Sequence, residues 1–112
     1  MEKTKFNQHQ SVFKFGELPD KMYLLVKGSV GMFLPTNRAN DPNFIIQENE
    51  LFGEMGVIEN ELRMATARCL VESDIIPITK EEFNKRVNNS DVFVKGSLKA
   101  LSYRLRSVEK KM

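Results

Sequence analysis

Hydrophobic and polar positions divide the chain into a β-type part up to residue 78 and a helical part after it. In the first part, short runs of β-branched and aromatic residues are separated by turn-forming residues, as in antiparallel sheets. Only Gly28 and Ser29 separate two of these runs, a spacing typical of a tight hairpin. The predicted strands are SVFKF at 11–15, MYLLVK at 22–27, VGMFL at 30–34, FIIQ at 44–47, MATARCLV at 64–71 and DIIPI at 74–78. This arrangement predicts a sandwich or a small rolled barrel.

After the last predicted strand, the spacing of apolar residues becomes that of amphipathic helices. Thr79 and Glu82 have capping-box spacing, and we expect residues 88–90 to end this helix and cap the next. The second helix carries one apolar seam with alternating intervals of four and three residues, formed by Val94, Leu98, Leu101, Leu105 and Val108. Three partners are candidates for covering this seam: the β-type part, a bound ligand, or the same helix of another subunit.

Length and composition set the domain organisation. With 112 residues, of which 41% are hydrophobic and 29% charged, the chain has material for one hydrophobic core. We expect one domain over residues 1–112, with a β-roll at about 11–78 and helices at about 80–110. No run approaches the roughly 20 apolar residues that span a bilayer. The lone Cys69 and the absence of an apolar signal segment favour a reducing, cytoplasmic setting.

The charge distribution excludes several functions. Residues 80–112 hold nine Lys/Arg and four Asp/Glu, whereas residues 1–79 hold eight and eleven. The basic residues are interleaved with the residues of the apolar seam, as on the solvent-exposed face of an amphipathic helix, so we expect no direct nucleic-acid contact. The only histidine, His9, lies in the polar start of the chain, and no His/Asp/Glu cluster indicates a metal or hydrolytic site. We therefore expect no enzyme activity, metal or cofactor.

The segment from Phe52 to Ala67 carries the candidate chemistry. Gly53 permits a sharp turn and a close approach to a ligand, and the next residues suffice for one helical turn with unpaired N–H groups. Arg63 then opens a strand with a planar, charged fork that suits two phosphate oxygens. An anionic ligand that also offers a hydroxyl group would satisfy both Arg63 and Glu54.

This segment resembles the phosphate-binding cassette of cyclic nucleotide-binding domains, the family of catabolite-activator-type regulators, protein kinase A regulatory subunits and nucleotide-gated channels. The family pattern is Phe-Gly-Glu, a short apolar helix, Pro-Arg and Ala-Ala-Thr, and the Glu54-to-Arg63 spacing matches without a gap. The upstream family pattern is also matched, by Val12, Phe13, Gly16, Glu17, Asp20, Tyr23, Leu25, Gly28 and Val30. The similarity runs from residue 11 to residue 83 and is specific because many spacings agree.

The resemblance implies a mainly β fold with helices, a double-stranded β-helix or jelly-roll-like β-roll, and a site for cAMP or cGMP. In such a site Glu54 accepts a hydrogen bond from the ribose 2′-hydroxyl, and Arg63 pairs with the exocyclic phosphate oxygens. The other implied ligand-binding residues are Gly53, Met55 and Gly56 through backbone N–H groups, and Met64 and Ala65 beside the phosphate. Phe44 and Ile46 fall on the strand that contacts the purine. Family members release the nucleotide unchanged.

The chain departs from the family pattern at several positions. Leu62 replaces the usual proline, so we expect a less rigid turn before Arg63. Met64 stands where cGMP-preferring members often have Thr or Ser, which favours cAMP. Glu59 and Glu61 are expected to face solvent, because carboxylates near the phosphate would repel it. The N-terminal helix of the family is missing or a stub, and His9 replaces a common turn glycine, so we expect an excised domain or a minimal variant.

The final helix has two functional interpretations in this family, a lid over the base and a coiled-coil dimer seam. Leu101, Tyr103 and Leu105 are candidate lid residues, and Arg104 could stack on or bond the purine. We interpret the chain as a sensor that passes nucleotide binding through these helices to an effector outside the chain. The alternative is a degenerate, nucleotide-free interaction or dimerisation module, which Leu62, Glu59 and Glu61 favour. Glu54 and Arg63 also have a structural alternative, a salt bridge with each other across an empty pocket. Phe13, Tyr23 and Cys69 are predicted core residues.

Overall fold

The computed structural model describes residues 2–111, and in the last helix it describes side chains only as far as Leu101. The chain separates into two compact units, one reaching Lys80 and the other beginning at Glu81. The first unit holds the strands and a short helix, and the second holds the C-terminal helices. In the described part of the chain, no helix is both long and apolar enough to cross a membrane.

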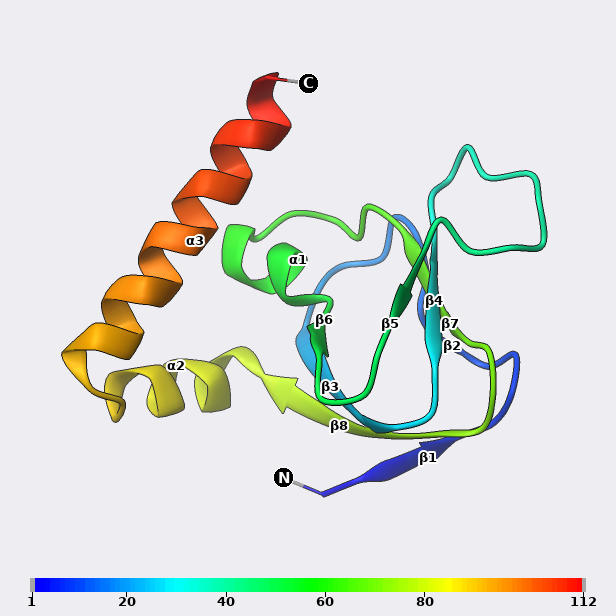
Figure 1. Ribbon diagram of the computed structural model, residues 1–112, viewed down its shortest axis with the longest axis horizontal. Coiled ribbons are helices and arrows are strands. Elements are labelled where there is room, and N and C mark those ends of the chain that lie inside the picture. The colour runs from blue at the N-terminus through cyan, green and yellow to red at the C-terminus, as the bar shows by residue number, and fades with distance from the viewer. Residues whose placement is uncertain (1, 112) are drawn as a thin grey trace. The chain divides into compact units, whose positions relative to one another are not determined.

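Two antiparallel four-stranded sheets form the first unit (Figure 1). The first sheet has the order β1-β8-β3-β6 and the second the order β2-β7-β4-β5. Their strands are β1 (Thr4–Phe6), β2 (Ser11–Phe13), β3 (Lys21–Lys27), β4 (Val30–Phe33), β5 (Phe44–Ile46), β6 (Leu51–Phe52), β7 (Thr66–Cys69) and β8 (Ser73–Thr79). All six predicted strands are present, so the predicted mainly β architecture is confirmed.

The predicted hairpin at Gly28 and Ser29 is wrong, because β3 and β4 belong to different sheets. Gly28 has a φ of 116°, and a Cβ atom there would lie 2.2 Å from Oγ of Ser73. The Ser29 amide donates a hydrogen bond of 3.2 Å to the same hydroxyl. The glycine therefore lets the chain pass tightly from one sheet to the other, a geometry that a side chain would block.

Strand boundaries also differ from the expectation near the chain start and before β7. Residues 4–6 form β1, which was not predicted and pairs with β8 in the register Thr4 to Ile75; of the two alternatives, a missing N-terminal helix or a stub, the structure agrees with the first. The strand predicted from Met64 begins only at Thr66. His9 has a φ of 70°, in the left-handed region that favours glycine, which agrees with the turn glycine that the family resemblance implies at this position.

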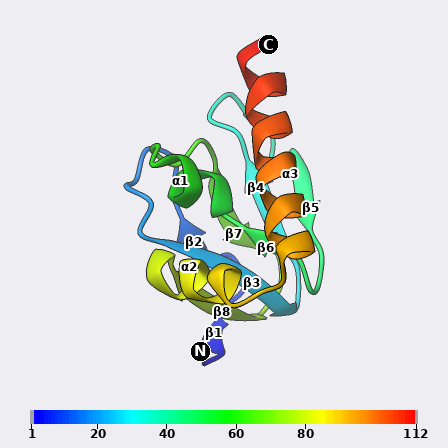
Figure 2. The same cartoon turned by 90° about the vertical axis from the view of Figure 1, so that its left-hand side faces the viewer.

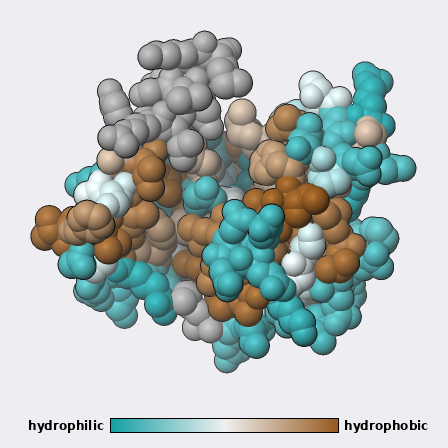
Figure 3. Space-filling view, viewed as in Figure 1, coloured by the Kyte–Doolittle hydropathy of each residue, from teal (hydrophilic) through white to brown (hydrophobic). Residues whose placement is uncertain are grey.

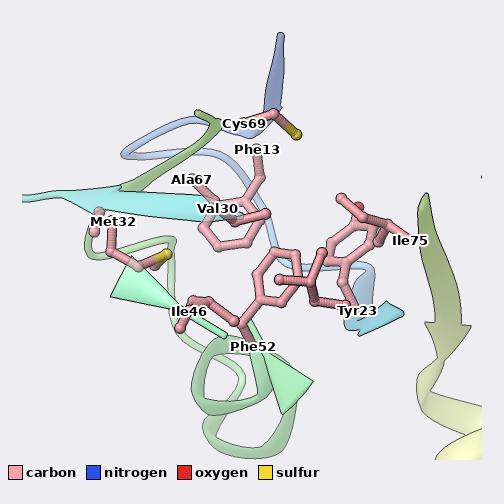
Figure 4. Packing of buried hydrophobic residues seen from close by; sticks show 11 residues of the cluster. Phe13, Tyr23, Val30, Met32, Ile46, Phe52, Ala67, Cys69 and Ile75 are labelled. Atoms are coloured by element: carbon pink, nitrogen blue, oxygen red, sulfur yellow. The ribbon is translucent and has the colours of Figure 1, made fainter. Parts of the chain in front are cut away.

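The core lies between the two sheets and is centred on three aromatic rings (Figure 4). Phe13 lies 6.0 Å from Tyr23 and 6.3 Å from Phe52, and Tyr23 and Phe52 are 5.6 Å apart, between ring centroids. These stacked and tilted rings bury a large apolar area in a small domain. Cys69 is fully buried in the same cluster, and burial raises the pKa of its thiol. The predictions of core positions for Phe13, Tyr23 and Cys69 are confirmed.

The second unit contains most of α2 (Lys80–Asn88) and all of α3 (Val92–Lys111), which leave their connecting turn in different directions (Figure 2). Ser90 closes α2, since its hydroxyl donates to the Val87 carbonyl at 2.6 Å. Asp91 begins α3, because its carboxylate accepts the Val94 amide at 2.9 Å. The two predicted helices are confirmed, but the second is capped by Asp91 and not by residues 88–90.

Candidate functional site

A sharp turn and a single short helix form one side of the candidate site. Helix α1 (Glu54–Glu59) follows β6 directly, as Figure 1 shows. Gly53 precedes it with a φ of 74°, and a Cβ atom at Gly53 would lie 2.8 Å from Cε2 of Phe13 and 3.0 Å from Nη1 of Arg63. The turn thus brings bare backbone against both side chains, which confirms the predicted role of Gly53 as a tight-turn residue.

Arg63 is buried, with 4% of its surface exposed, beside this turn. Its Nη1 donates a hydrogen bond of 2.7 Å to the Gly53 carbonyl, and its Nη2 donates to the Lys21 carbonyl. The guanidinium carbon lies 4.1 Å from the ring centroid of Phe13. Nε of Arg63 is buried, and no described residue provides a hydrogen-bond acceptor for it. Such an orphaned donor is uncommon in folded proteins and calls for an explanation.

The charge of Arg63 is only partly compensated by the surrounding residues. Burial lowers the pKa of its guanidinium, and the nearby Tyr23, Asp20, Glu17 and Glu54 oppose that shift to a smaller extent. Taking a cation out of water without a direct ionic partner is unfavourable. An anion at Nε would supply both the missing acceptor and the missing negative charge.

Glu54 is half-buried at the start of α1. Burial raises the pKa of its carboxyl group, while a backbone hydrogen bond and the charge of Arg63 act in the opposite direction. The two ion pairs found among the described residues do not include Glu54 or Arg63. The direct salt bridge considered as an alternative for this pair is therefore not what the structure shows, although each group acts on the pKa of the other.

The backbone of Arg63 is held by the loop that follows β2. Its amide donates to the Glu17 carbonyl at 2.9 Å, and its carbonyl accepts the Gly16 amide at 2.8 Å. These bonds fix the turn at the position where Leu62 replaces the family's proline. The sequence pattern pointed to a looser turn and missed this compensation, because it depends on contacts between segments some 45 positions apart.

The remaining residues predicted in the cassette occupy different environments. Met55 and Gly56 are half-buried in α1, and Gly56 is close enough to Pro19 that a Cβ atom would lie 3.0 Å from it. Ala65 is buried in the core cluster, whereas Met64 is 69% exposed. Of this group, only Met64 presents its side chain largely to solvent.

The predicted base-contact residues are also divided. Phe44 and Ile46 share one face of β5, but Ile46 is a buried core residue and Phe44 is 52% exposed. Hydrophobic side chains reach the surface over β5 and β6 in Figure 3. Leu101 is 55% exposed in the second unit. The side chains of Arg104 and Leu105, like that of Tyr103, lie outside the described residues.

The acidic residues before Arg63 have different surroundings. Glu61 is exposed, as predicted, and Glu59 is half-buried. No group of three or more His, Cys, Asp or Glu side chains suited to a metal ion occurs in the portion of the chain described by the structure.

Known proteins share both the sequence pattern and the fold. The family model of the cyclic nucleotide-binding domain matches residues 3–90. The EAL enzyme Bd1971, in its half-site-occupied form, is 30% identical with a TM-score of 0.82, over 96% of this chain and 97% of that one. Structures of Bd1971 in cAMP-bound and cGMP-bound forms are also 30% identical, with TM-scores of 0.75 and 0.77, and this chain spans 29% and 30% of them.

Two further proteins match at lower sequence identity. The anaerobic regulatory protein of Bacillus subtilis (strain 168) is 24% identical over 98% of this chain, which spans 47% of that protein. The catabolite activator protein of Thermus thermophilus shares the fold, with a TM-score of 0.76 and 23% identity over 98% of this chain and 52% of that one. The chain thus spans about half the length of both proteins.

Fold and comparisons together define a domain of the β-roll class, mainly β with a few helices. The chain belongs to the cyclic nucleotide-binding domain family, as its sequence pattern predicted.

Proposed function

We propose that this domain binds cAMP in preference to cGMP and that Arg63 holds the exocyclic phosphate. The observation that carries the proposal is the buried Nε of Arg63, which has no acceptor among the residues that the structure describes. A phosphate oxygen is a strong acceptor and carries the charge that would compensate the desolvated guanidinium. The cAMP-bound and cGMP-bound forms of the related Bd1971 domain support this choice of ligand class.

The other contacts follow from the position of Arg63 beside α1. Glu54 would accept the ribose 2′-hydroxyl, and the backbone N–H groups of Gly53, Met55 and Gly56 would face the phosphate. Phe44 is the β5 side chain that we expect to meet the base, because it is half-exposed whereas Ile46 is buried. Ala65 would line the phosphate position from the core, and exposed Met64 would favour cAMP by offering no hydroxyl to a guanine amino group.

The biological output of binding belongs to the same proposal. Ligand contacts with α1 would change the preferred arrangement of α2 and α3, and a cytoplasmic effector would read that change. Such transmission requires that the ligand bind two arrangements with different affinities. Hydrogen exchange with and without cAMP tests it: slower exchange in residues 54–59 with an altered rate in residues 80–101 supports transmission. Unchanged exchange in residues 80–101 would refute it.

A thermal-shift titration tests ligand binding itself. A ligand that binds only the folded state raises the unfolding temperature with concentration. We expect a concentration-dependent rise with cAMP, a smaller one with cGMP, and none with linear 5′-AMP, which has a different charge and no cyclic phosphate. A rise of equal size with 5′-AMP would show nonspecific anion binding.

The rival function is an interaction module that has lost nucleotide binding. Backbone carbonyls already accept hydrogen bonds from both Nη atoms of Arg63, which is the observation favouring this alternative. In that case Arg63 would only tie together the Gly53 turn and β3, and α3 would mediate a homodimer. Absence of any shift with either cyclic nucleotide, together with a dimer in sedimentation, would support it.

A further inference from the structure

Phe13 has contacts that a simple core residue does not need. It packs with Tyr23 and Phe52, as described, yet the guanidinium carbon of Arg63 also lies over its ring, 4.1 Å from the centroid. The ring edge also approaches Gly53, where a Cβ atom would lie 2.8 Å from Cε2. Phe13 therefore joins the aromatic core to both halves of the candidate site, the turn and the arginine.

The ring opposes a tilt of the guanidinium that the two hydrogen bonds of Arg63 would still permit. Bonds from Nη1 to Gly53 and from Nη2 to Lys21 fix one edge of the guanidinium, but the group can still tilt about that edge. An aromatic face under a cation attracts it electrostatically and gives a planar guanidinium a surface to stack on. With the tilt restricted, the direction of the N–H bond at Nε is fixed before any acceptor arrives.

We infer that Phe13 is a positioning residue for the ligand phosphate: it holds the guanidinium plane of Arg63 so that Nε points at the incoming oxygen. This inference rests on the proposed function. A preorganised donor binds its acceptor more tightly because less freedom is lost on binding. The predicted effect of Phe13 is thus on ligand affinity, in addition to the packing that any buried aromatic residue provides.

The test compares Phe13→Leu with two matched controls. Phe52→Leu removes a ring from the same cluster, and Phe33→Leu removes the ring that lies 4.2 Å from the guanidinium carbon of Arg68, outside that cluster. Calorimetric titration with cAMP should give up to about tenfold weaker binding for Phe13→Leu, the cost of ordering one long side chain on binding. Both controls should stay within about twofold of the unmodified chain, because they leave the guanidinium of Arg63 ordered.

A double-mutant cycle separates positioning from loss of packing. Lysine carries the charge of arginine but does not stack as a plane, so Phe13→Leu should weaken cAMP binding by less than about twofold when added to Arg63→Lys. A tenfold loss in both backgrounds would overturn the inference, because the effect would then not pass through the guanidinium. Equal losses for Phe13→Leu and Phe52→Leu would overturn it as well.

A ligand-free measurement distinguishes failure of this inference from failure of the proposed function. In the nitrogen–proton NMR spectrum, the ring should shift the N–H resonance at Nε of Arg63 upfield, and Phe13→Leu should remove that shift while Phe52→Leu preserves it. If the unmodified chain shows the shift but binds neither cyclic nucleotide, the proposed function fails and the ring is a structural support only. If the shift is absent, Phe13 does not position Arg63, whether or not cAMP binds.

Discussion

Nη1 of Arg63 donates a hydrogen bond of 2.7 Å to the carbonyl oxygen of Gly53, ten positions earlier in the chain. Gly53 lies just before α1 and Arg63 lies a few residues after it, so this bond connects the two ends of the segment that contains the short helix. A change at either residue should therefore affect the other. This coupling makes the cassette one structural unit, although its two key residues lie at opposite ends of the segment.

Substitution of Gly53 by alanine should destabilise the domain by about 3 kcal/mol, since overpacking adds to backbone strain. The residue has a φ of 74°, and the new Cβ would clash with Phe13 and crowd Arg63. Urea denaturation measures the change. Gly16→Ala is the matched control, because Gly16 has a φ of 85° but open space around it, and should lose only about 1 kcal/mol.

Equal losses for the two variants would show that backbone strain alone explains the requirement for glycine at position 53. The close packing around the turn would then contribute nothing to the difference in unfolding free energy. A larger loss for Gly53→Ala isolates the contribution of the contacts with Phe13 and Arg63.

Much of the first unit was predictable because strand and turn signals are local. The six predicted strands and the short helix after Gly53 follow from residue spacing, and the core positions of Phe13, Tyr23 and Cys69 follow from residue type and apolar neighbours. The two missed strands, β1 and β6, have three and two residues, too few to show a period of two. Their pairing depends on β8 and β3, which are distant in sequence.

The pH dependence of stability should reveal the burial of Glu54. Its pKa is raised above the ordinary value of 4.5, so the folded state holds this proton more tightly than the unfolded state does. The contribution of Glu54 to folding stability therefore falls as pH rises from the ordinary value through the raised one. At neutral pH the ionised, partly buried carboxylate of Glu54 therefore lowers the folding stability of the ligand-free domain.

Glu54→Gln should therefore unfold at a higher temperature than the unmodified chain at pH 7, and the difference should vanish below the ordinary glutamate pKa. Thermal unfolding followed by circular dichroism from pH 3.5 to 7.5 measures it. Glu61→Gln, at an exposed carboxylate on the same segment, is the control and should show little difference at any pH. A difference for Glu54→Gln that does not change with pH would contradict a buried, titrating carboxyl group.

The role proposed for Glu54 can be tested by changing the ligand. If its carboxylate accepts the ribose 2′-hydroxyl, the unmodified chain should bind cAMP about tenfold or more tightly than 2′-deoxy-cAMP, since bonds to charged groups are the stronger ones. Glu54→Ala should bind the two nucleotides with nearly equal affinity. Retained discrimination in this variant would place the hydroxyl against another group.

The side-chain arrangement in the site was harder to predict than its location. The spacing of Gly53, Glu54 and Arg63 identified the segment that forms the candidate site. This spacing does not show that Arg63 donates to the Lys21 carbonyl or lies over the ring of Phe13. Both contacts connect segments that only the folded sheets bring together. The hairpin prediction failed for the same reason, since the two residues at Gly28 and Ser29 allow either a hairpin or a passage between sheets.

Calorimetric titration of cAMP into Arg63→Ala and Arg68→Ala is the most direct test of the central claim that Arg63 receives the phosphate. Arg68 is the matched control, because its guanidinium also lies over a ring, that of Phe33, but outside the cassette turn. Arg63→Ala should bind about a hundredfold more weakly than the unmodified chain, as expected when a buried charged partner is removed. Arg68→Ala should bind normally. Equal cAMP affinity in all three proteins would contradict the account.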